Sequence, residues 1–397
     1  MTAPATNERT RTAYLGPEAS FSHQAAIEAL PKTETVPLPS FGAILQALQD
    51  NQSRPEGYDY AVLPVENSTN GSVVQALDLL AKCGLDPNTS RYTDLEVVDE
   101  HYLEVHHCLF VSRAWAEHRL DQEALSYIQD HNGVLESSDR DQILKQLNIK
   151  TLYSHAQVWG QCNNILSSLL PPGHVERVDM SSTSAAAAFV AGLHKTQPSP
   201  TNGQHGIKEE KQRPLPASGD QDSACAAAIS SLLAGQKHSA ELICIARNIE
   251  DEPGANTTRF LVLRNRLRQP TTIHHGLNHQ SSSTTQNKSL LAFTISHHVP
   301  GSLALALAVF ARCGFNLSAI QSRPKPKSGG ATRASVTKNG GPVDMNWKYV
   351  FFVECLHSRD DSEPDEGSQK LKTLQEELKA VTETLVLLGS WRDRLSM

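Results

Sequence analysis

The chain has 397 residues, enough for two or three domains at about 150 residues each. Lys and Arg total 36 against 43 Asp and Glu, a formal net charge of −7, so the basic excess that binds nucleic-acid phosphates is absent. No stretch approaches the roughly 20 consecutive apolar residues of a membrane-spanning helix. Composition therefore argues against nucleic acid and membranes as partners.

The seven cysteines are widely spaced, and no C-x-x-C pair occurs. This pattern is typical of reduced thiols rather than of disulfides or a zinc site. Residues 1–17 contain no apolar run like that of a signal peptide, and the roughly dozen residues before the first apolar run are too few for a usual transit peptide. We therefore expect a cytoplasmic protein.

From residue 12 onward, short apolar runs alternate with segments of helical periodicity, which favours α/β layers around a largely parallel sheet. The expected strands cover 13–15, 35–38, 60–63, 105–111 and 150–153. The expected helices cover 22–30, a segment opened by Ser40 as N-cap, 73–82, a segment after Ser138, 157–169 and 184–193.

Four segments interrupt this alternation and are too polar to support a core. They are 196–222, 266–288, 325–345 and 358–368. The second is the best candidate for a linker. We therefore expect an α/β domain over 10–265, with a polar insertion at 196–222, and a second domain over 289–397, with an insertion at 325–345.

The second domain has its own order of elements. Strands are expected over 290–298, 316–322, 349–357 and 385–391, and helices over 301–313 and 371–381. This β-α-β-β-α-β order predicts a ferredoxin-like domain.

Familiar cofactor and metal motifs do not occur in the sequence: it has no Walker A loop, no dinucleotide-binding glycine pattern, no H-E-x-x-H and no G-x-S-x-G. His275 and His279 have the i, i+4 spacing of helical metal ligands, but their Ser/Thr-rich surroundings predict solvated loop histidines. Adjacent His106 and His107 would point to opposite faces of a strand. We therefore expect neither a metal nor a cofactor.

Three clusters of small polar side chains stand at strand ends. They are Pro64–Ser68 with Gly71, Ser154-His155 with Gln157 and Gln161, and Asn256–Phe260. Ligands of open α/β sheets bind beyond the carboxyl ends of strands, where helix N-termini offer free N–H groups. The alternative for the first cluster is an N-cap and turn. Together with Arg259, the three clusters favour a pocket for a small carboxylate-bearing molecule.

These clusters belong to a series of motifs that resembles the prephenate dehydratase family with a C-terminal ACT regulatory domain. The motifs follow the family's order at 14–17 with 20–26, 64–68, 154–155 with 161–162, 182–183 with the following alanines, 226–229 and 256–260. Residues 300–303 and 314–317 to 322–324 resemble the ACT domain's effector motifs, and 388–390 its last strand. The resemblance thus covers nearly the whole chain.

The resemblance implies a fold. The catalytic domain would consist of two α/β subdomains of the periplasmic-binding-protein type, with the active site in the cleft between them. One subdomain would combine residues 10–90 with 184–265, and the other would be 91–183.

The resemblance also implies a reaction of the carbon–oxygen lyase (hydro-lyase) class. Prephenate would lose water and carbon dioxide to give phenylpyruvate during L-phenylalanine biosynthesis, and aromatisation would drive the step without a cofactor. The implied catalytic residues are Thr258, at the leaving hydroxyl, and Arg259. The implied substrate-binding residues are Asn67, Ser154, Gln161, Ser182, Thr183, Ser20 and Phe260.

Side-chain chemistry bears on two of these implied roles. A threonine hydroxyl is a poor acid near neutral pH, so we expect Thr258 to hydrogen-bond the leaving group rather than to transfer its proton fully. For Arg259, the alternative to a role in the reaction is a structural ion pair.

The ACT domain implies phenylalanine as an allosteric inhibitor, acting in a homodimer or homotetramer. The implied effector residues are Gly301, Leu303, Asn316, Leu317, Gln321, Ser322 and Arg323. Gly301 would let an amino acid approach the backbone at a helix N-terminus, and its alternative is a plain helix start.

Four residues at three sites depart from the family pattern. Ala19-Ser20 replaces Gly-Thr, Ala156 replaces a common Pro, and Gln321 replaces Glu. Ser20 keeps a hydroxyl, whereas Gln321 lacks the negative charge of a motif that recognises the amino acid.

Two other functions are considered. One is arogenate dehydratase, which acts on the amino analogue; the other is a non-catalytic amino-acid sensor, against which the intact motif 256–260 argues.

Overall fold

A computed structural model of the chain describes residues 10–50, 57–85, 90–192, 225–268, 286–325, 348–358 and 364–395. Within these residues the strands form two sheets, one of ten strands and one of five. No helix of this described part is both long and apolar enough to cross a membrane. His275, His279 and nearly all of the expected insertions and linker lie outside it.

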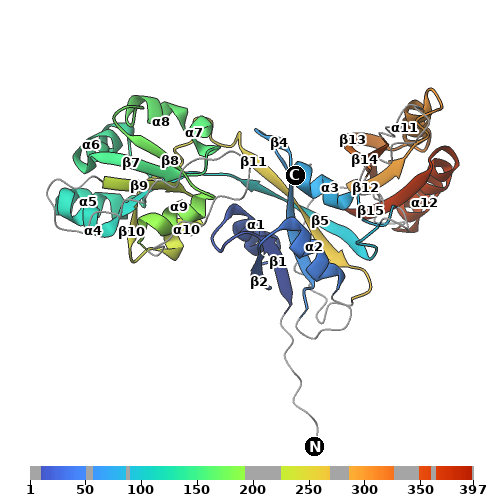
Figure 1. The fold of residues 1–397 in the computed structure, drawn as a ribbon, viewed down its shortest axis with the longest axis horizontal. Helices are drawn as coiled ribbons and strands as arrows, with labels where there is room; N and C mark the ends of the chain where they lie inside the picture. The colour runs from blue at the N-terminus through green and yellow to red at the C-terminus, as the bar shows by residue number, and fades with distance from the viewer. Residues whose placement is uncertain are drawn as a thin grey trace, which may run out of the picture. The chain divides into compact units, whose positions relative to one another are not determined.

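The chain divides into two compact units, each with one of the sheets (Figure 1). The first unit takes its described residues from 1–15, 25–103 and 258–397, and the second from 16–24 and 104–257. The expected grouping of 184–265 with 10–90 is therefore wrong for most of that segment. The strand β9 (Cys225–Ser230) pairs with strands of the second sheet, because its apolar run is buried along nearly its whole length and suits the middle of a sheet.

The N-terminal part of the first unit confirms the expected alternation of strands and helices. Its elements are β1 (Arg11–Leu15), α1 (Phe21–Ala29), β2 (Glu34–Leu38), α2 (Phe41–Gln49), β3 (Tyr60–Asn67), β4 (Gly71–Ser72), α3 (Val74–Leu80), β5 (Leu95–Glu104) and β11 (Thr257–Asn265). β1 runs parallel to β2 and β3, whereas β11 runs antiparallel to β3. Ser40 caps α2 as expected, accepting a hydrogen bond of 3.1 Å from the Ala43 N–H.

The second unit has the strand order β10-β6-β9-β7-β8. Its elements are β6 (Cys108–Ser112), α4 (Arg113–Arg119), α5 (Gln122–Asp130), α6 (Ser137–Leu147), β7 (Ile149–Ser154), α7 (Val158–Gln161), α8 (Asn163–Ser168), β8 (Glu176–Asp179), α9 (Thr183–Val190), β9, α10 (Leu232–Lys237) and β10 (Leu242–Ala246). The single helix expected over 157–169 is two short helices, because Cys162 leaves helical geometry at φ −122° and ψ 33°.

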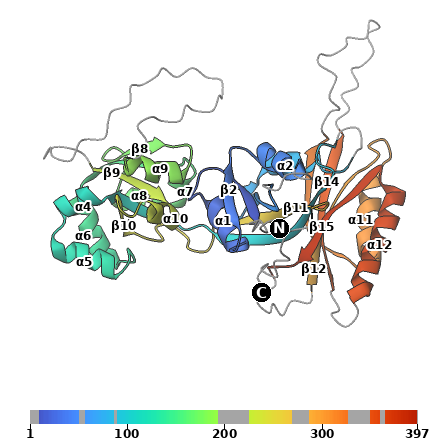
Figure 2. The same cartoon turned by 90° about the horizontal axis from the view of Figure 1, so that it is seen from below.

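The C-terminal part of the first unit confirms the ferredoxin-like order. Its elements are β12 (Gln286–Thr294), α11 (Ser302–Arg312), β13 (Asn316–Pro324), β14 (Tyr349–Ser358), α12 (Pro364–Val381) and β15 (Thr384–Arg392). The strands pair antiparallel in the order β13-β14-β12-β15. Figures 1 and 2 show α11 and α12 on the face of this sheet that is turned away from α2 and α3.

The two faces of this C-terminal sheet are both buried, in different cores. Leu291 and Phe293 pack against the side chains of α11 and α12, whereas Leu290 and Ala292 join the core formed by α2, α3 and the strands beside them. Alternate residues of one strand thus serve two cores. The C-terminal sheet is therefore packed directly onto the elements that carry Asn67 and Thr258.

A close backbone approach joins this sheet to the rest of the first unit. β15 pairs in parallel with β5, with Gly389 opposite Val97. A Cβ atom at position 389 would lie 2.0 Å from the Val97 carbonyl oxygen. Only glycine fits this contact, which fixes the C-terminal sheet to β5.

Candidate functional site

The ends of β3 and β11 bring three of the expected site residues together. Thr258 lies opposite Asn67, and Arg259 lies opposite Glu66. The register shifts just after Arg259, beside Pro64 of β3, which has no N–H for the ladder. Bulges of this kind re-aim side chains and are common beside active sites. The motif 64–68 thus shapes the strand end on which the candidate site is built.

Asn67 fixes the direction of its hydrogen bond to Thr258. Its Oδ1 accepts from the backbone N–H groups of Thr69, at 3.1 Å, and Asn70, at 2.9 Å. Its Nδ2 therefore faces Thr258 Oγ1, at 2.9 Å, and can only donate there. The Thr258 hydroxyl accepts this bond, and its own proton is left to donate to another group.

Arg259 is buried among carboxylates. Its Nε and Nη2 lie 2.9 Å and 2.8 Å from Glu100 Oε2, and Nη2 also lies 2.9 Å from Glu354 Oε2. Nη1 lies 3.8 Å from Glu66 Oε2. Burial disfavours the charged guanidinium, but Glu354 and Glu100 more than offset it, and the pKa of Arg259 is raised. The structural ion pair considered for Arg259 is thus present, and a role toward substrate remains a proposal.

A second cation extends this cluster into the C-terminal part of the unit. Lys288 Nζ lies 2.9 Å from Glu100 Oε1 and 2.9 Å from Asp393 Oδ1. Tyr102 donates to Glu100 Oε2 at 3.2 Å, and burial followed by the Glu100 charge raises the pKa of its hydroxyl. The side chains of Glu100 and Lys288 are 0% and 3% exposed. This cluster was not predicted, although a charged residue within an apolar strand is itself a signal of a paired buried charge.

Two expected substrate-binding residues are buried and make contacts within the protein. Phe260 is 1% exposed, so its ring packs in the interior, and this burial does not support a contact with substrate. Ser154 is fully buried, and its hydroxyl donates to the Ile229 carbonyl oxygen at 2.8 Å. Because a serine hydroxyl has one proton, Ser154 cannot also donate to a substrate in this structure, and its burial does not support the expected role in substrate binding.

Gln161 is paired with a buried histidine in the second unit. Its Oε1 lies 2.8 Å from His107 Nε2, so His107 carries its proton on that nitrogen. Burial lowers the pKa of His107, and its Nδ1 is buried without a hydrogen-bond partner among the described residues. His106 instead contacts Glu250 at 2.7 Å, and the two histidines lie between β5 and β6 rather than within the strand expected over 105–111. A role of Gln161 toward substrate stays a prediction.

The other expected residues of the second unit have local structural roles. Ser182 caps α9 by accepting from the Ala185 N–H at 3.0 Å, and Thr183 is 7% exposed. Ser20 accepts from the His23 N–H at 3.3 Å. Ala19 has φ 63°, in the left-handed region, which explains why glycine suits this position. Roles of Ser20, Ser182 and Thr183 toward substrate stay predictions.

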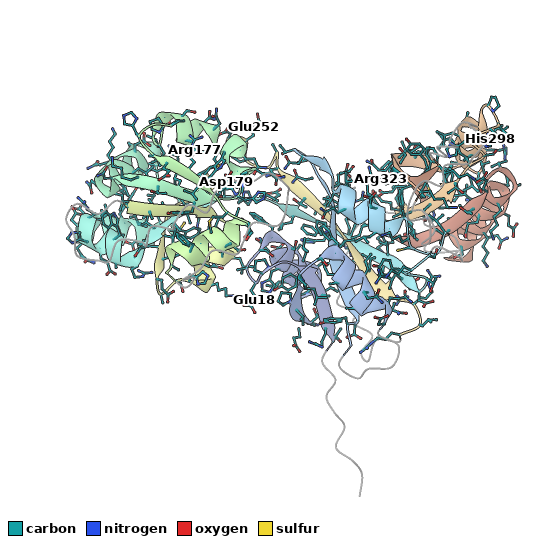
Figure 3. The ribbon with its side chains drawn as sticks, in the orientation of Figure 1. Glu18, Arg177, Asp179, Glu252, His298 and Arg323 are labelled. Atoms are coloured by element: carbon teal, nitrogen blue, oxygen red, sulfur yellow. The ribbon has the colours of Figure 1, made fainter. Side chains whose placement is uncertain are left out.

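The expected effector residues lie at the start of α11 and along β13. Gly301 has φ 83° and precedes α11, and Leu303 in the first turn of α11 is partly buried against the core between this helix and the sheet. Asn316, Leu317 and Ser322 are exposed, and Gln321 is half-buried. Arg323 is engaged instead with α3, because its Nε donates to Asp78 Oδ1 at 2.6 Å (Figure 3). Among the described residues, no group of three or more His, Cys, Asp or Glu side chains could hold a metal ion.

The fold and the strand-end groups define an α/β protein of two units whose hydroxyl, amide and guanidinium groups suit a carboxylate-bearing ligand. A family model described as "Prephenate dehydratase" matches residues 12–268. The "Probable prephenate dehydratase" of Saccharomyces cerevisiae is 31% identical over 359 residues, covering 87% of this chain and 86% of that protein. The chain belongs to the prephenate dehydratase family.

Solved structures share the fold. A prephenate dehydratase from Arthrobacter aurescens in complex with L-Phe aligns with a TM-score of 0.61 and 19% identity, covering 98% of this chain and 91% of that one. A protein described as GqqA, a novel type of quorum quenching acylase, aligns with a TM-score of 0.57 and 19% identity, covering 97% and 98%. These likenesses support the fold alone, because one fold can carry different activities.

Proposed function

We propose that the chain catalyses the decarboxylating dehydration of prephenate to phenylpyruvate, water and carbon dioxide in L-phenylalanine biosynthesis. Family membership supports the reaction, and the Asn67–Thr258 hydrogen bond of 2.9 Å is the structural observation that carries it. A group beside the leaving hydroxyl has to donate a hydrogen bond, and the Thr258 proton is held ready for this.

In this reaction two bonds break and no oxidant or reductant is needed. The bond between the ring and its carboxylate breaks to release carbon dioxide, and its electron pair enters the ring. The bond between the ring and the hydroxyl breaks at the opposite carbon, and the hydroxide takes up a proton to leave as water. Thr258 stabilises the departing oxygen by hydrogen bonding, and the bond that it accepts from Asn67 polarises its own O–H group.

The substrate carboxylates need cationic or N–H partners. Arg259 is the cation next to Thr258 in the chain, and Nη1 is its least engaged nitrogen, at 3.8 Å from Glu66. We assign this nitrogen to a substrate carboxylate. No cofactor enters this scheme, because aromatisation drives the reaction.

Arogenate is the second candidate substrate. A protein of Arabidopsis thaliana described as "Arogenate dehydratase/prephenate dehydratase 1, chloroplastic" is 28% identical over 356 residues. The two substrates differ by a keto or an amino group away from the leaving hydroxyl, which the proposed roles of Thr258 and Asn67 do not distinguish. Purified protein incubated with each substrate should release phenylpyruvate from prephenate faster than phenylalanine from arogenate. Turnover of neither would contradict the proposal and favour an amino-acid sensor.

We further propose that the C-terminal ferredoxin-like part is an ACT domain through which phenylalanine inhibits the enzyme. Gly301 and the exposed residues of β13 would receive the amino acid. β13 is the edge strand of its sheet, and its residues Leu317 and Ile320 are 37% and 48% exposed, respectively. This apolar surface is suited to a second copy of the chain in a homodimer or homotetramer. Calorimetry should detect phenylalanine binding, and its absence would contradict the inhibitor proposal.

We also propose that the protein is located in the cytoplasm. All seven cysteines, Cys225 among them, are free thiols in the structure, as suits a reducing compartment.

A further inference from the structure

Arg259 is held by residues from distant parts of the chain. Glu100 comes from β5, whereas Glu354 comes from β14 of the C-terminal domain. Lys288 of β12, in the same domain, holds the other oxygen of Glu100 at 2.9 Å. Two side chains of the C-terminal domain therefore act on the guanidinium, one directly and one through Glu100.

The contacts of Arg259 are uneven. Nε and Nη2 face the carboxylates of Glu100 and Glu354 within 2.9 Å. Nη1 points toward Glu66, whose side chain is 44% exposed while that of Arg259 is only 9% exposed. One edge of the planar guanidinium is thus anchored, and the other is directed to the more exposed Glu66 side chain. Such anchoring removes the rotational freedom that a long side chain would otherwise lose on binding substrate.

The anchor depends on where the C-terminal sheet lies. Gly389 fixes β15 against Val97, three residues before Glu100 on β5. β14, which carries Glu354, is joined to β15 through β12. A shift of this sheet by about 1 Å would break charge-assisted hydrogen bonds of this length.

We propose that Glu354 and Lys288 of the C-terminal domain are positioning residues for Arg259, so that this domain orients a group of the catalytic site directly. The inference rests on the proposed function. It assigns the domain a part in turnover that does not require an effector.

The first test compares Glu354→Ala and Glu354→Gln with the wild type. Glu354→Ala should lower kcat/KM for prephenate about tenfold, as expected for a hydrogen bond to a charged group. Glu354→Gln keeps an acceptor oxygen in the same place and should recover part of this loss. The matched control is Glu377→Ala, which removes a carboxylate that pairs with Arg312 at 2.6 Å in the same domain, and it should turn over like the wild type. Wild-type kcat/KM in both Glu354 variants would overturn the proposal.

A double-mutant cycle separates positioning from a merely structural effect. In an Arg259→Lys background the forked guanidinium is missing, so Glu354→Ala should add little to the loss. If Glu354→Ala costs the same factor with Arg259 and with the lysine, Glu354 does not act through Arg259. Should Glu354→Ala fail to fold, the cycle is run with Glu354→Gln, and the same two outcomes decide it.

An NMR measurement tests the contact between Glu354 and Arg259 independently of the proposed reaction. In protein labelled with ¹⁵N-arginine, the Arg259 Nε–H signal is assigned by its loss in Arg259→Lys. It should shift in Glu354→Ala and stay in place in Glu377→Ala, and an unchanged signal in Glu354→Ala would overturn the contact. Turnover of neither prephenate nor arogenate by the wild type would instead contradict the proposed function, while this arm would still test the anchor.

Discussion

Asn67 and Thr258 lie 191 residues apart in the chain and share a hydrogen bond of 2.9 Å across the ends of β3 and β11. The Asn67 carbonyl oxygen is occupied by two backbone N–H groups of the following turn, so its amide nitrogen can only donate to the Thr258 oxygen. The hydroxyl proton is therefore directed away from Asn67. This geometry makes the roles of the two side chains separable by substitution.

The hydroxyl of Thr258 should be required for turnover, whereas its methyl group should not. Thr258→Val keeps the shape of the side chain and removes the donor, and it should lower kcat by about 10²- to 10⁴-fold. Thr258→Ser keeps the donor and should remain within about tenfold of the wild type, with the loss due to a less fixed side-chain rotamer. Steady-state kinetics with prephenate measure both values, and equal activities of the two variants would rule out the hydroxyl's role.

The pairing of Thr258 with Asn67 shows what the sequence could and could not predict. Each motif was recognisable at a strand end, because apolar runs and polar termini are local patterns. Their contact depends on the antiparallel register of β3 and β11, which is set by long-range pairing and by the bulge beside Pro64. Local periodicity carries no information about this register.

The predicted subdomain boundary is wrong for a related reason. The run Ala226–Ile229 indicates a buried strand in either sheet, and only its pairing with β6 and β7 shows which sheet it joins. By contrast, the β-α-β-β-α-β order of the C-terminal part of the first unit was predictable from its elements one by one. Glu354 was overlooked because it stands within an apolar strand, where its partners come from other elements.

Turnover should fall when the Asn67 amide nitrogen is replaced by an oxygen. In Asn67→Asp, one carboxylate oxygen still accepts from the turn, while the other can no longer donate to Thr258. The Thr258 proton would then be drawn to the introduced carboxylate, so kcat should fall by about 10²-fold or more. The control is Asn70→Asp, which places the same charge three residues along the chain without replacing a partner of Thr258. A loss in Asn70→Asp as large as that in Asn67→Asp would show that charge alone is responsible.

Gly389 should be required for both stability and turnover. In Gly389→Ala the new Cβ would lie 2.0 Å from the Val97 carbonyl oxygen, so β15 and β5 would have to separate. Overpacking of this kind should lower the free energy of unfolding by about 3 kcal/mol. Because β5 carries Glu100 and β15 is joined through β12 to β14, which carries Glu354, kcat/KM should fall as well. Gly160→Ala is the control, since nothing lies within 4 Å of its added Cβ, and its stability should stay within about 1 kcal/mol of the wild type. Equal stability of the two variants in urea titrations would contradict the close approach.

His107 should make the protein less stable as the pH falls. Burial lowers the pKa of His107 below the ordinary histidine value of 6.5, so the unfolded chain takes up a proton more readily than the folded one. The stability that neutral His107 contributes is therefore fully present above pH 6.5, and it is lost as the pH falls through the folded-state pKa. His107→Gln removes the titration and keeps an amide that can donate to Gln161. Melting temperatures measured between pH 5 and pH 8 should fall less steeply on the acid side in this variant, whereas the exposed control His174→Gln should follow the wild type. An acid-side slope unchanged in His107→Gln would show that another group is responsible.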